Sequence, residues 1–365
     1  MKFRCERDVL ADALATAGRA ATGRTGSLPV LSGVRVELSG DVLRVTGTDL
    51  ELTIEVEITV SGDKDGATVL PARLAADIVR SLESGAVTVD GDQDEVQIAA
   101  GRSQFAVRPM STDDFPRRPE RPGDAVTLPV GTFAEALRQV ARAASNDESR
   151  PILTGVLLAA EDDGLRLVAT DSYRLAVRDL PGTSVLRRDQ RVLVPSRALN
   201  ELVRLAPSSG EITLRLGERD AMFDVGSARL STRLIEGEFP NYRQLIPSDY
   251  PNCLIVGREP FLDAVRRVKL LVRDPTTPVR MALRSDGIEL SVITQDWGQA
   301  AEQVDAKYEG SEMTVAFNPN YLIDGVEAVT SDDVQLETLD ALKPATIRPT
   351  EGSEYLYLLM PVRVT

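Results

Sequence analysis

The side chains of this sequence that could do chemistry are mostly carboxylates. Asp113-Asp114 and Asp162-Asp163 are adjacent pairs, and paired carboxylates can hold the magnesium ion of a nuclease. A Thr-Asp pair also follows an apolar alternating run twice, as Thr48-Asp49 and Thr170-Asp171. The acidic pairs stand close to Pro or Gly, where turns form, and no strand places a third carboxylate with them. A metal-dependent nuclease therefore stays an alternative that the sequence does not favour.

The sequence contains no histidine, which excludes Ser-His and Cys-His nucleophiles, histidine-ligated metals and imidazole bases. Cys5 and Cys253 are far apart and form no CxxC, so neither a disulfide scaffold nor a thiolate metal site is expected. Neither GxxxxGK[ST] nor GxGxxG occurs, so both common nucleotide-phosphate loops are missing. We expect a non-catalytic protein with no metal and no other cofactor.

The composition is that of a soluble protein with two or three domains. The chain has 365 residues, of which 42% are hydrophobic, and its net charge is -14. That charge argues against a protein that coats nucleic acid or an anionic membrane with its whole surface. No apolar run approaches the roughly 20 residues of a membrane span, and MKFRCERDVL has no signal-peptide core. We expect a cytoplasmic protein in a reducing compartment.

Several landmarks recur in the same order along the chain, at intervals of about 122 to 127 residues. They are Thr48, Thr170 and Thr294; Pro71, Pro195 and Pro319 before a helix; Pro29, Pro151 and Pro278 opening a strand; and amphipathic helices that begin at Asp8, Thr132 and Glu259. An interval this long is the size of a globular domain and exceeds a solenoid repeat. The polar, proline-bearing stretches at 120–123 and 248–251 then predict three domains, 1–122, 123–250 and 251–365.

Each predicted domain is α+β. Apolar spacing predicts helices over 7–19, 73–84, 132–145, 196–205, 259–273 and 320–330, and alternation predicts strands between them. The pattern is β-α-β-β-β written twice, which gives two helices against antiparallel sheet. The Thr-Asp pairs fall at strand-to-strand turns in this pattern. An Asp that accepts backbone N–H groups in such a turn is the favoured interpretation over a catalytic carboxylate.

Charge is divided unequally between helices and strands. The six predicted helices are together slightly positive, so the remainder carries all of the net negative charge. Helices gathered on one surface would give a mildly basic face suited to weak, sequence-independent contact with a polyanion. Solvated arginines without such a role are the alternative. No aromatic residues are interleaved with these arginines, so stacking on a single strand is not expected.

The repeat, together with RPILTGVLLAAEDDGLRLVATDSYRLAV, EGEFPNYRQLIP and the terminal YLLMPVRV, resembles the bacterial DNA polymerase III beta subunit family, the sliding clamps. The resemblance covers the whole chain. It implies three copies of a DNA-clamp (processivity fold) domain and a head-to-tail homodimer that closes a ring around duplex DNA. It also implies a non-catalytic accessory subunit that tethers polymerase III alpha, other polymerases and repair proteins, and that a clamp loader opens.

The resemblance implies three groups of site residues. DNA-contacting positions are Arg24, Arg73, Arg197 and, more weakly, Arg204. Dimer-interface positions are Phe105, Leu270 and Leu271. A pocket for linear peptides, typically Gln-Leu followed by apolar or aromatic residues, is implied at Arg150, Ile152, Leu153, Thr170, Ser172, Tyr173, Arg174, Leu175, Pro240, Gln244, Leu245, Asn318, Tyr321, Leu342, Pro344, Leu358, Met360, Pro361, Val362, Arg363 and Val364. Within it, Arg174 and Arg363 are expected to bind peptide carbonyls.

Some positions depart from the family pattern, namely Ile152, Ser172-Tyr173, Gln244 and the ending Val364-Thr365. They affect the expected peptide preference. Ordinary core packing is the alternative for Leu153, Leu175 and Leu358, and equally for the Leu270-Leu271 pair. A structural repeat protein without DNA, and a second clamp copy that confers resistance to a clamp-binding compound, are further alternatives.

Overall fold

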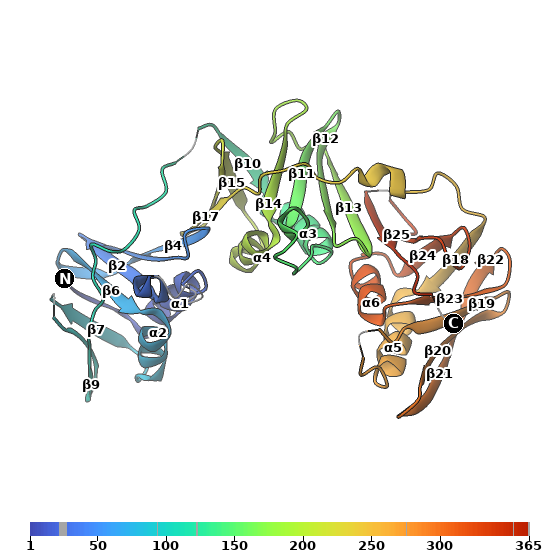
Figure 1. The fold of residues 1–365 in the computed structure, drawn as a ribbon. Helices are drawn as coiled ribbons and strands as arrows, with labels where there is room; N and C mark the ends of the chain where they lie inside the picture. Colours follow the sequence, from blue (N-terminus) through green and yellow to red (C-terminus); the bar gives the residue numbers. More distant parts are fainter. Residues whose placement is uncertain (22–27, 93, 122, 275, 353, 364–365) are drawn as a thin grey trace. The chain divides into compact units, whose positions relative to one another are not determined.

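The computed structural model describes residues 1–21, 28–92, 94–121, 123–274, 276–352 and 354–363, so Arg24 and Val364 lie outside the described residues. The chain forms two compact units (Figure 1). The first comprises Met1–Gly131 and Arg204–Leu234, and the second comprises Thr132–Val203 and Ile235–Thr365. Within the described part, no helix is both long and apolar enough to cross a membrane.

The first unit contains two antiparallel sheets and two complete helices. The helices are α1 (Arg7–Gly18) and α2 (Ala72–Ser81). The smaller sheet has the order β5 (Ser61–Lys64), β1 (Lys2–Glu6), β7 (Ala86–Gly91), β8 (Val96–Ala100), β9 (Ser103–Val107). The larger has the order β10 (Ala125–Pro129), β15 (Glu211–Leu216), β16 (Asp220–Val225), β17 (Ala228–Arg233), β4 (Leu52–Thr59), β3 (Val42–Thr48), β2 (Gly33–Ser39), β6 (Gly66–Pro71).

The second unit also contains a larger and a smaller antiparallel sheet, together with helices. Its larger sheet has the order β14 (Arg191–Pro195), β11 (Gly155–Glu161), β12 (Gly164–Thr170), β13 (Arg174–Pro181), β26 (Tyr355–Leu359), β25 (Ala345–Pro349), β24 (Asp333–Thr338), β18 (Asn252–Gly257), β22 (Ala306–Glu309). Its smaller sheet has the order β21 (Gly298–Val304), β20 (Gly287–Thr294), β19 (Val279–Arg284), β23 (Met313–Phe317). Helices α5 (Arg258–Lys269) and α6 (Pro319–Glu327), and most of α3 (Val130–Ala141) and α4 (Ser196–Leu205), belong to it.

Helix α1 shows why these segments fold as they do. Leu10, Leu14 and Ala17 recur at helical spacing and are buried, and α1 packs on α2 and on strands β3 and β4. The sheet supplies Val45 and Ile54, both fully buried. Burial of this apolar face stabilises helix and sheet together, and about 1.5–3 kcal/mol per large apolar side chain is typical.

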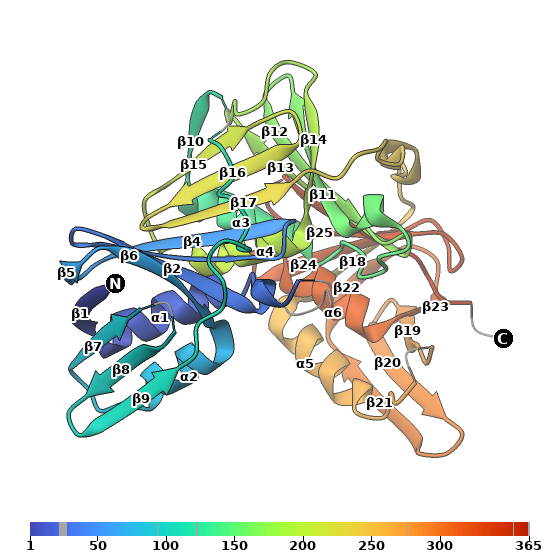
Figure 2. The ribbon, with the colours of Figure 1, turned by 60° about the vertical axis from the view of Figure 1, so that its left-hand side comes forward.

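Both large sheets run across a predicted domain boundary. In the first unit β17 pairs antiparallel with β4, and Arg229 lies opposite Glu55 (Figure 2). In the second unit β13 pairs antiparallel with β26, and Leu175 lies opposite Leu358. Each large sheet is therefore continuous across one predicted domain boundary.

The predicted β-α-β-β-β pattern is confirmed in order. The middle copy has it unbroken, from β10 through α3 to β13 and from β14 through α4 to β17. The outer copies add one short strand each, β5 and β22, which pair with β1 and β18.

One detail of the prediction was wrong. Pro29 and Pro151 open short 3-10 turns, Pro29–Ser32 and Pro151–Thr154, and the strands begin only after them. Proline has no N–H to donate to a ladder, so it fits the first position of such a turn better than a strand.

Candidate functional site

The repeated Thr-Asp pair forms a backbone-bonded turn in both copies. Asp171 Oδ1 accepts hydrogen bonds from the backbone N–H groups of Tyr173 (2.9 Å) and Arg174 (3.0 Å). Asp49 Oδ1 accepts equivalent bonds from Glu51 (3.1 Å) and Leu52 (2.8 Å). The third residue has a positive φ in both turns, 78° at Leu50 and 81° at Ser172. The interpretation of these aspartates as turn residues is confirmed.

The turn at residues 170–174 differs from the equivalent turn at residues 48–52, because its last residue is an arginine. Arg174 Nε donates to Asp171 Oδ2 (3.0 Å), and its NH1 group donates to Asp324 of α6 and to the Tyr357 hydroxyl (3.4 Å). The guanidinium also lies 4.3 Å from the centre of the Tyr321 ring. Burial works to lower the pKa of Arg174, but Tyr357, Asp324 and Asp171 outweigh it, so the pKa is raised. These contacts occupy Arg174 inside the protein instead of presenting it to peptide carbonyls.

The C-terminal segment is hydrogen-bonded to this turn. The backbone N–H of Met360 donates to the carbonyl of Tyr173 (2.9 Å), directly after the β13–β26 pairing ends. The N–H of Val362 donates to the carbonyl of Ala316 (2.7 Å) at the end of β23. Tyr173 and Met360, predicted from distant parts of the sequence, therefore lie next to each other.

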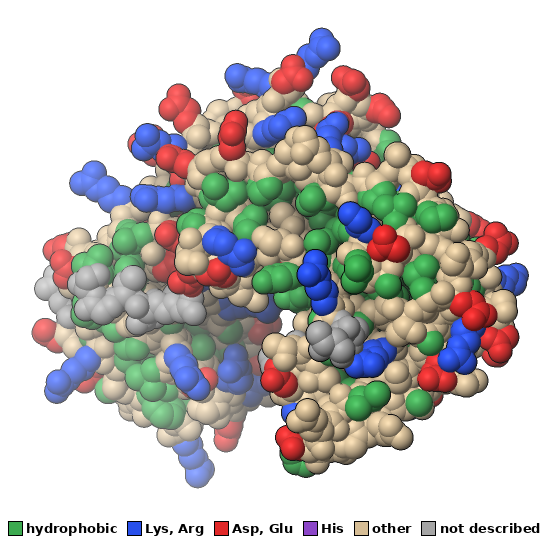
Figure 3. Space-filling model, turned by 45° about the vertical axis from the view of Figure 1, so that its right-hand side comes forward, with side chains coloured by type: hydrophobic (Ala, Val, Ile, Leu, Met, Phe, Trp, Pro, Cys, Tyr) green, Lys and Arg blue, Asp and Glu red, His purple; other side chains and the backbone are tan. Residues whose placement is uncertain are grey.

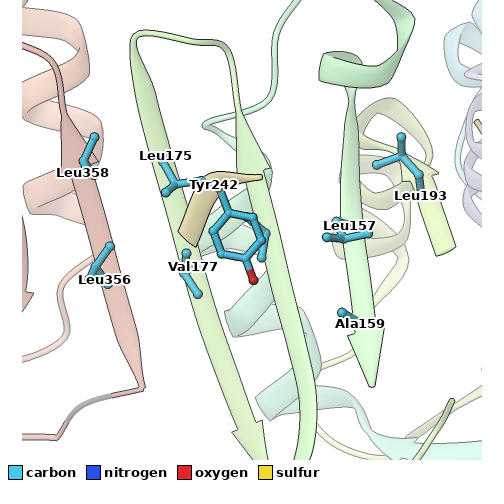
Figure 4. Packing of buried hydrophobic residues seen from close by; sticks show 9 residues of the cluster. Leu157, Ala159, Leu175, Val177, Leu193, Tyr242, Leu356 and Leu358 are labelled. Atoms are coloured by element: carbon cyan, nitrogen blue, oxygen red, sulfur yellow. The ribbon is translucent and has the colours of Figure 1, made fainter. Parts of the chain in front are cut away.

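A buried apolar cluster, here called the sheet cluster, lies on one face of the large sheet of the second unit. Figure 4 shows the ring of Tyr242 projecting over the strands between Val177 and Leu157. The members of the cluster are Leu157, Ala159, Val168, Leu175, Val177, Leu193, Tyr242, Leu356 and Leu358, with Ile152, Ile235, Phe239 and Ile246 packed against it. Only Leu175, Leu358 and Ile152 of these were predicted as site residues. Alternation along β13 and β26 could have added Val177 and Leu356.

Four large apolar residues of the predicted pocket are exposed. Tyr173 is 60% exposed, Leu245 48%, Leu342 67% and Met360 38%. We call these four residues the apolar rim. Leu245 ends the short turn Tyr242–Leu245 whose Tyr242 enters the sheet cluster, so the rim borders the cluster there. Exposed apolar residues of this kind, in turns beside a packed sheet, are typical of a binding surface.

The other predicted pocket residues divide into buried and accessible ones. Leu153, Leu175 and Leu358 are buried, as the core-packing alternative predicts. They can support a bound ligand from below but present little surface to it. Asn318 caps α6 by accepting from the backbone N–H groups of Asn320 and Tyr321. Arg150 pairs with Asp147 (2.8 Å) and donates to the Ser172 hydroxyl (3.2 Å). Thr170 is buried; Ile152, Tyr321, Pro344, Pro361 and Val362 are half-buried; Pro240, Gln244 and Arg363 are exposed.

The predicted basic residues that the structure describes, Arg73, Arg197 and Arg204, lie on helices. Arg73 is the second residue of α2, and its side chain is 97% exposed, 3.9 Å from Asp77. Arg197 is the second residue of α4 and Arg204 lies in its last turn, and both are exposed. On the face drawn in Figure 3, Lys and Arg side chains are interspersed with Asp and Glu side chains. Single exposed arginines of this kind suit weak contact with phosphates.

The predicted dimer residues are accessible in the single chain. Phe105 lies on β9, the edge strand of its sheet, and is 38% exposed. Leu270 follows α5 and is 73% exposed, whereas Leu271 is half-buried. An exposed apolar residue on an edge strand, which pairs on one side only, is typical of a surface that pairs with another chain.

The acidic pairs do not form a metal centre in the described part of the chain. Asp162 and Asp163 lie exposed in the turn between β11 and β12, and Asp113 and Asp114 lie exposed in a turn after β9. Among the described residues, no three His, Cys, Asp or Glu side chains come together as metal ligands would.

Comparison with known proteins gives the family directly. Three family models match in succession: the N-terminal domain of the DNA polymerase III beta subunit at residues 1–119, its central domain at 127–241 and its C-terminal domain at 243–363. The beta sliding clamp of Streptomyces coelicolor is 35% identical over 382 residues, and that of Synechocystis is 34% identical over 390, with 100% of both chains covered in each case.

Solved structures agree along the full length. A sliding clamp from Bartonella birtlesii, solved bound to griselimycin, superposes with a TM-score of 0.93 at 32% identity, covering 100% of both chains. The clamp of Bacillus subtilis gives a TM-score of 0.91 at 29% identity, again over 100% of both chains. The predicted fold, three clamp domains of α+β type, and the predicted non-catalytic class are confirmed. The chain belongs to the DNA polymerase III beta subunit family, the bacterial sliding clamps.

Proposed function

We propose that two copies of this chain pair head to tail and close a ring around duplex DNA in the cytoplasm. The three domains of each copy are 1–122, 123–250 and 251–365. A closed ring holds DNA by its topology, so it needs no tight grip on phosphates, and scattered basic residues such as Arg73 and Arg197 suffice. Strong phosphate binding would slow sliding, because each phosphate contact adds affinity in a salt-dependent way.

The ring tethers its partners through the apolar rim. The partners are polymerase III alpha, other polymerases, the clamp loader and repair proteins. Each binds through a short linear peptide, typically Gln-Leu followed by apolar or aromatic residues. The observation that carries this part is an exposed apolar set, Tyr173, Leu245, Leu342 and Met360, beside a fully packed apolar floor. A packed sheet cluster gives such a site a rigid base, and the exposed apolar side chains can adapt to short peptides of varied sequence.

Light scattering on a sizing column tests the ring. At micromolar concentration the expected mass is twice the chain mass of 39.6 kDa. Leu270→Asp is expected to yield monomers, because a charge at a desolvated apolar contact is costly. Val42→Asp is the matched control, since Val42 is 43% exposed on β3 and should not affect the dimer. A monomeric wild-type chain would contradict the proposal.

Retention on DNA tests the topological hold. The protein, loaded on closed circular DNA, is expected to stay bound at a salt concentration that releases it from linear DNA of the same length. Equal release from both forms would point to ordinary surface binding and would contradict encirclement.

A further inference from the structure

Helix α6 carries two carboxylates, Asp324 and Glu327, whose partners differ. Both contact Arg142, the residue after α3, at 3.9 Å from Asp324 and 3.3 Å from Glu327. Glu327 pairs in addition with Arg266 of α5, at 2.7 Å. Asp324 pairs in addition with Arg174. Side-chain exposure is similar, 33% for Asp324 and 36% for Glu327. The two residues can therefore be compared directly, since they are similarly exposed on one helix but only Asp324 contacts the turn at residues 170–174.

The Arg174 guanidinium has two carboxylate partners, Asp171 in its own turn and Asp324 on α6. The side chain of Arg174 is only 10% exposed and that of Asp171 is 9% exposed, whereas that of Asp324 is 33% exposed. The guanidinium itself is therefore shielded from water and depends on its protein partners. Loss of one partner of a buried ion pair is costly because the remaining charge stays desolvated. Without Asp324, we expect Arg174 to move toward solvent and to lose its place over the Tyr321 ring.

The turn that Arg174 anchors also carries part of the apolar rim. Tyr173 precedes Arg174, and its carbonyl accepts the Met360 N–H that fixes the C-terminal segment. The Ser172 hydroxyl on the same turn accepts from Arg150. A shift of Arg174 would therefore displace Tyr173 and Met360 together, although Asp324 itself is not part of the rim.

We infer that Asp324 is a positioning residue for peptide binding, which acts by holding Arg174 and thereby the turn that presents Tyr173 and Met360. The inference rests on the proposed function of the apolar rim. It makes peptide affinity depend on a helix carboxylate that no peptide contacts. Coupling through one such contact is typically worth about 5- to 150-fold in affinity.

The test compares Asp324→Asn with Glu327→Gln in the full-length protein. The probe is a fluorescein-labelled peptide that begins Gln-Leu and ends Leu-Phe, and its binding is followed by fluorescence anisotropy. Asp324→Asn is expected to weaken binding at least about fivefold, whereas Glu327→Gln stays within about twofold of wild type. Asp324→Glu, which keeps the carboxylate, is expected to restore most of the affinity. Thermal unfolding of each variant reports whether stability has changed equally.

The outcomes separate the two ideas. If wild type does not bind the probe, the proposed role of the rim fails and this inference fails with it. If wild type binds and Asp324→Asn binds equally well, the inference alone fails. Equal losses in Asp324→Asn and Glu327→Gln would show that α6 acts only through general stability, which also overturns it. If Asp324→Asn does not fold, Asp324→Glu and Arg174→Lys carry the comparison, because Arg174→Lys keeps the charge but cannot reach both carboxylates. Full affinity in both would overturn the inference.

Discussion

The two sheet borders have the same backbone register and opposite side-chain chemistry. On the first unit's sheet, Thr53 lies opposite Ser231 and Glu55 lies opposite Arg229. On the second unit's sheet, the corresponding pairs are Leu175 with Leu358 and Val177 with Leu356. On this face of the sheet the first border is therefore polar and ionic, and the second is apolar.

Each border is covered by the segment that follows its domain. Arg118, in the segment after β9, donates to Glu55 at 2.7 Å, where Arg229 (3.1 Å) and Arg44 (3.5 Å) also meet the carboxylate. Beside the second border, Tyr242 from the segment after β17 packs in the sheet cluster between Val177 and Leu157. The first cover is held by charge, and the second by burial of an aromatic ring.

The difference between the two borders shows that copies of one fold can carry different side chains at equivalent positions, so the fold alone does not provide the proposed binding surface. The turns at Asp49 and Asp171 accept equivalent backbone hydrogen bonds, but the first leads into Thr53 and Glu55 and the second into Leu175 and Val177. Glu55 is only 7% exposed and already surrounded by three arginines, so the polar border is satisfied internally. The proposed site for apolar peptides needs apolar surface that the chain itself leaves partly uncovered, and Tyr173 and Met360 beside the second border provide it.

The largest expected effect is loss of packing at the apolar border. Leu358 is 1% exposed in the sheet cluster, so Leu358→Ala is expected to lower the free energy of unfolding by about 2–5 kcal/mol. Ser231→Ala changes the corresponding position of the polar border and is expected to cost under about 1 kcal/mol. Urea unfolding followed by circular dichroism measures both. Similar midpoints for the two variants would contradict the contrast between the borders.

The next effect tests the charge at the polar border. Glu55→Gln leaves three arginines around a neutral amide, and breaking a buried pair in this way costs about 3 kcal/mol. Glu57→Gln removes a neighbouring carboxylate whose side chain is 43% exposed, and about 1 kcal/mol or less is expected. The same urea measurement compares them. If the Glu55 variant is as stable as wild type, the arginines are held by other contacts.

Much of the fold could be predicted from the sequence because apolar residues follow the helix and strand periods. The two additional strands could not. β5 consists of Ser61, Gly62, Asp63 and Lys64, all exposed, so nothing in its pattern marks a strand. It is held by backbone pairing to β1 at a sheet edge, and such pairing leaves no signal in side-chain type.

The candidate site was predictable only in part. Resemblance supplied Leu175, Leu358 and Met360, but the sequence did not show that the first two lie buried and the third exposed. That distinction depends on packing between segments far apart in the sequence, since the sheet cluster joins β13, β26 and Tyr242. The Arg174–Asp324 pair joins residues 150 positions apart, and no local pattern specifies such a partner.

A smaller effect, on peptide affinity alone, tests the contrast between the two turns. Met360→Ala is expected to weaken binding of the Gln-Leu peptide about tenfold, near 1.4 kcal/mol. Little change in stability is expected, because Met360 is 38% exposed. Leu50→Ala is the control, since Leu50 is 47% exposed at the corresponding turn of the polar border. Anisotropy measures both affinities. Equal weakening by both variants would mean that the peptide uses the polar border as well.

The smallest expected effect is a dependence of the polar border on pH. The hydrogen bond from Arg44 lowers the pKa of Glu57 in the folded protein, and burial opposes this only partly. The unfolded chain, with a pKa near 4.5, then binds the proton more readily than the folded one. The pair therefore contributes its full stability above about pH 4.5 and loses it as the pH falls through the lowered pKa of the folded state.

Unfolding midpoints at neutral and acid pH test this dependence. The difference between wild type and Glu57→Gln is expected to shrink toward zero in acid, because both then carry an uncharged group at this position. The difference between wild type and Leu358→Ala is expected to persist, since no charge contributes to the apolar contact. Should the Glu57→Gln difference be unchanged at low pH, its origin would be packing of the side chain on Arg44. The polar border would then resemble the apolar one more closely than the ion pairs indicate.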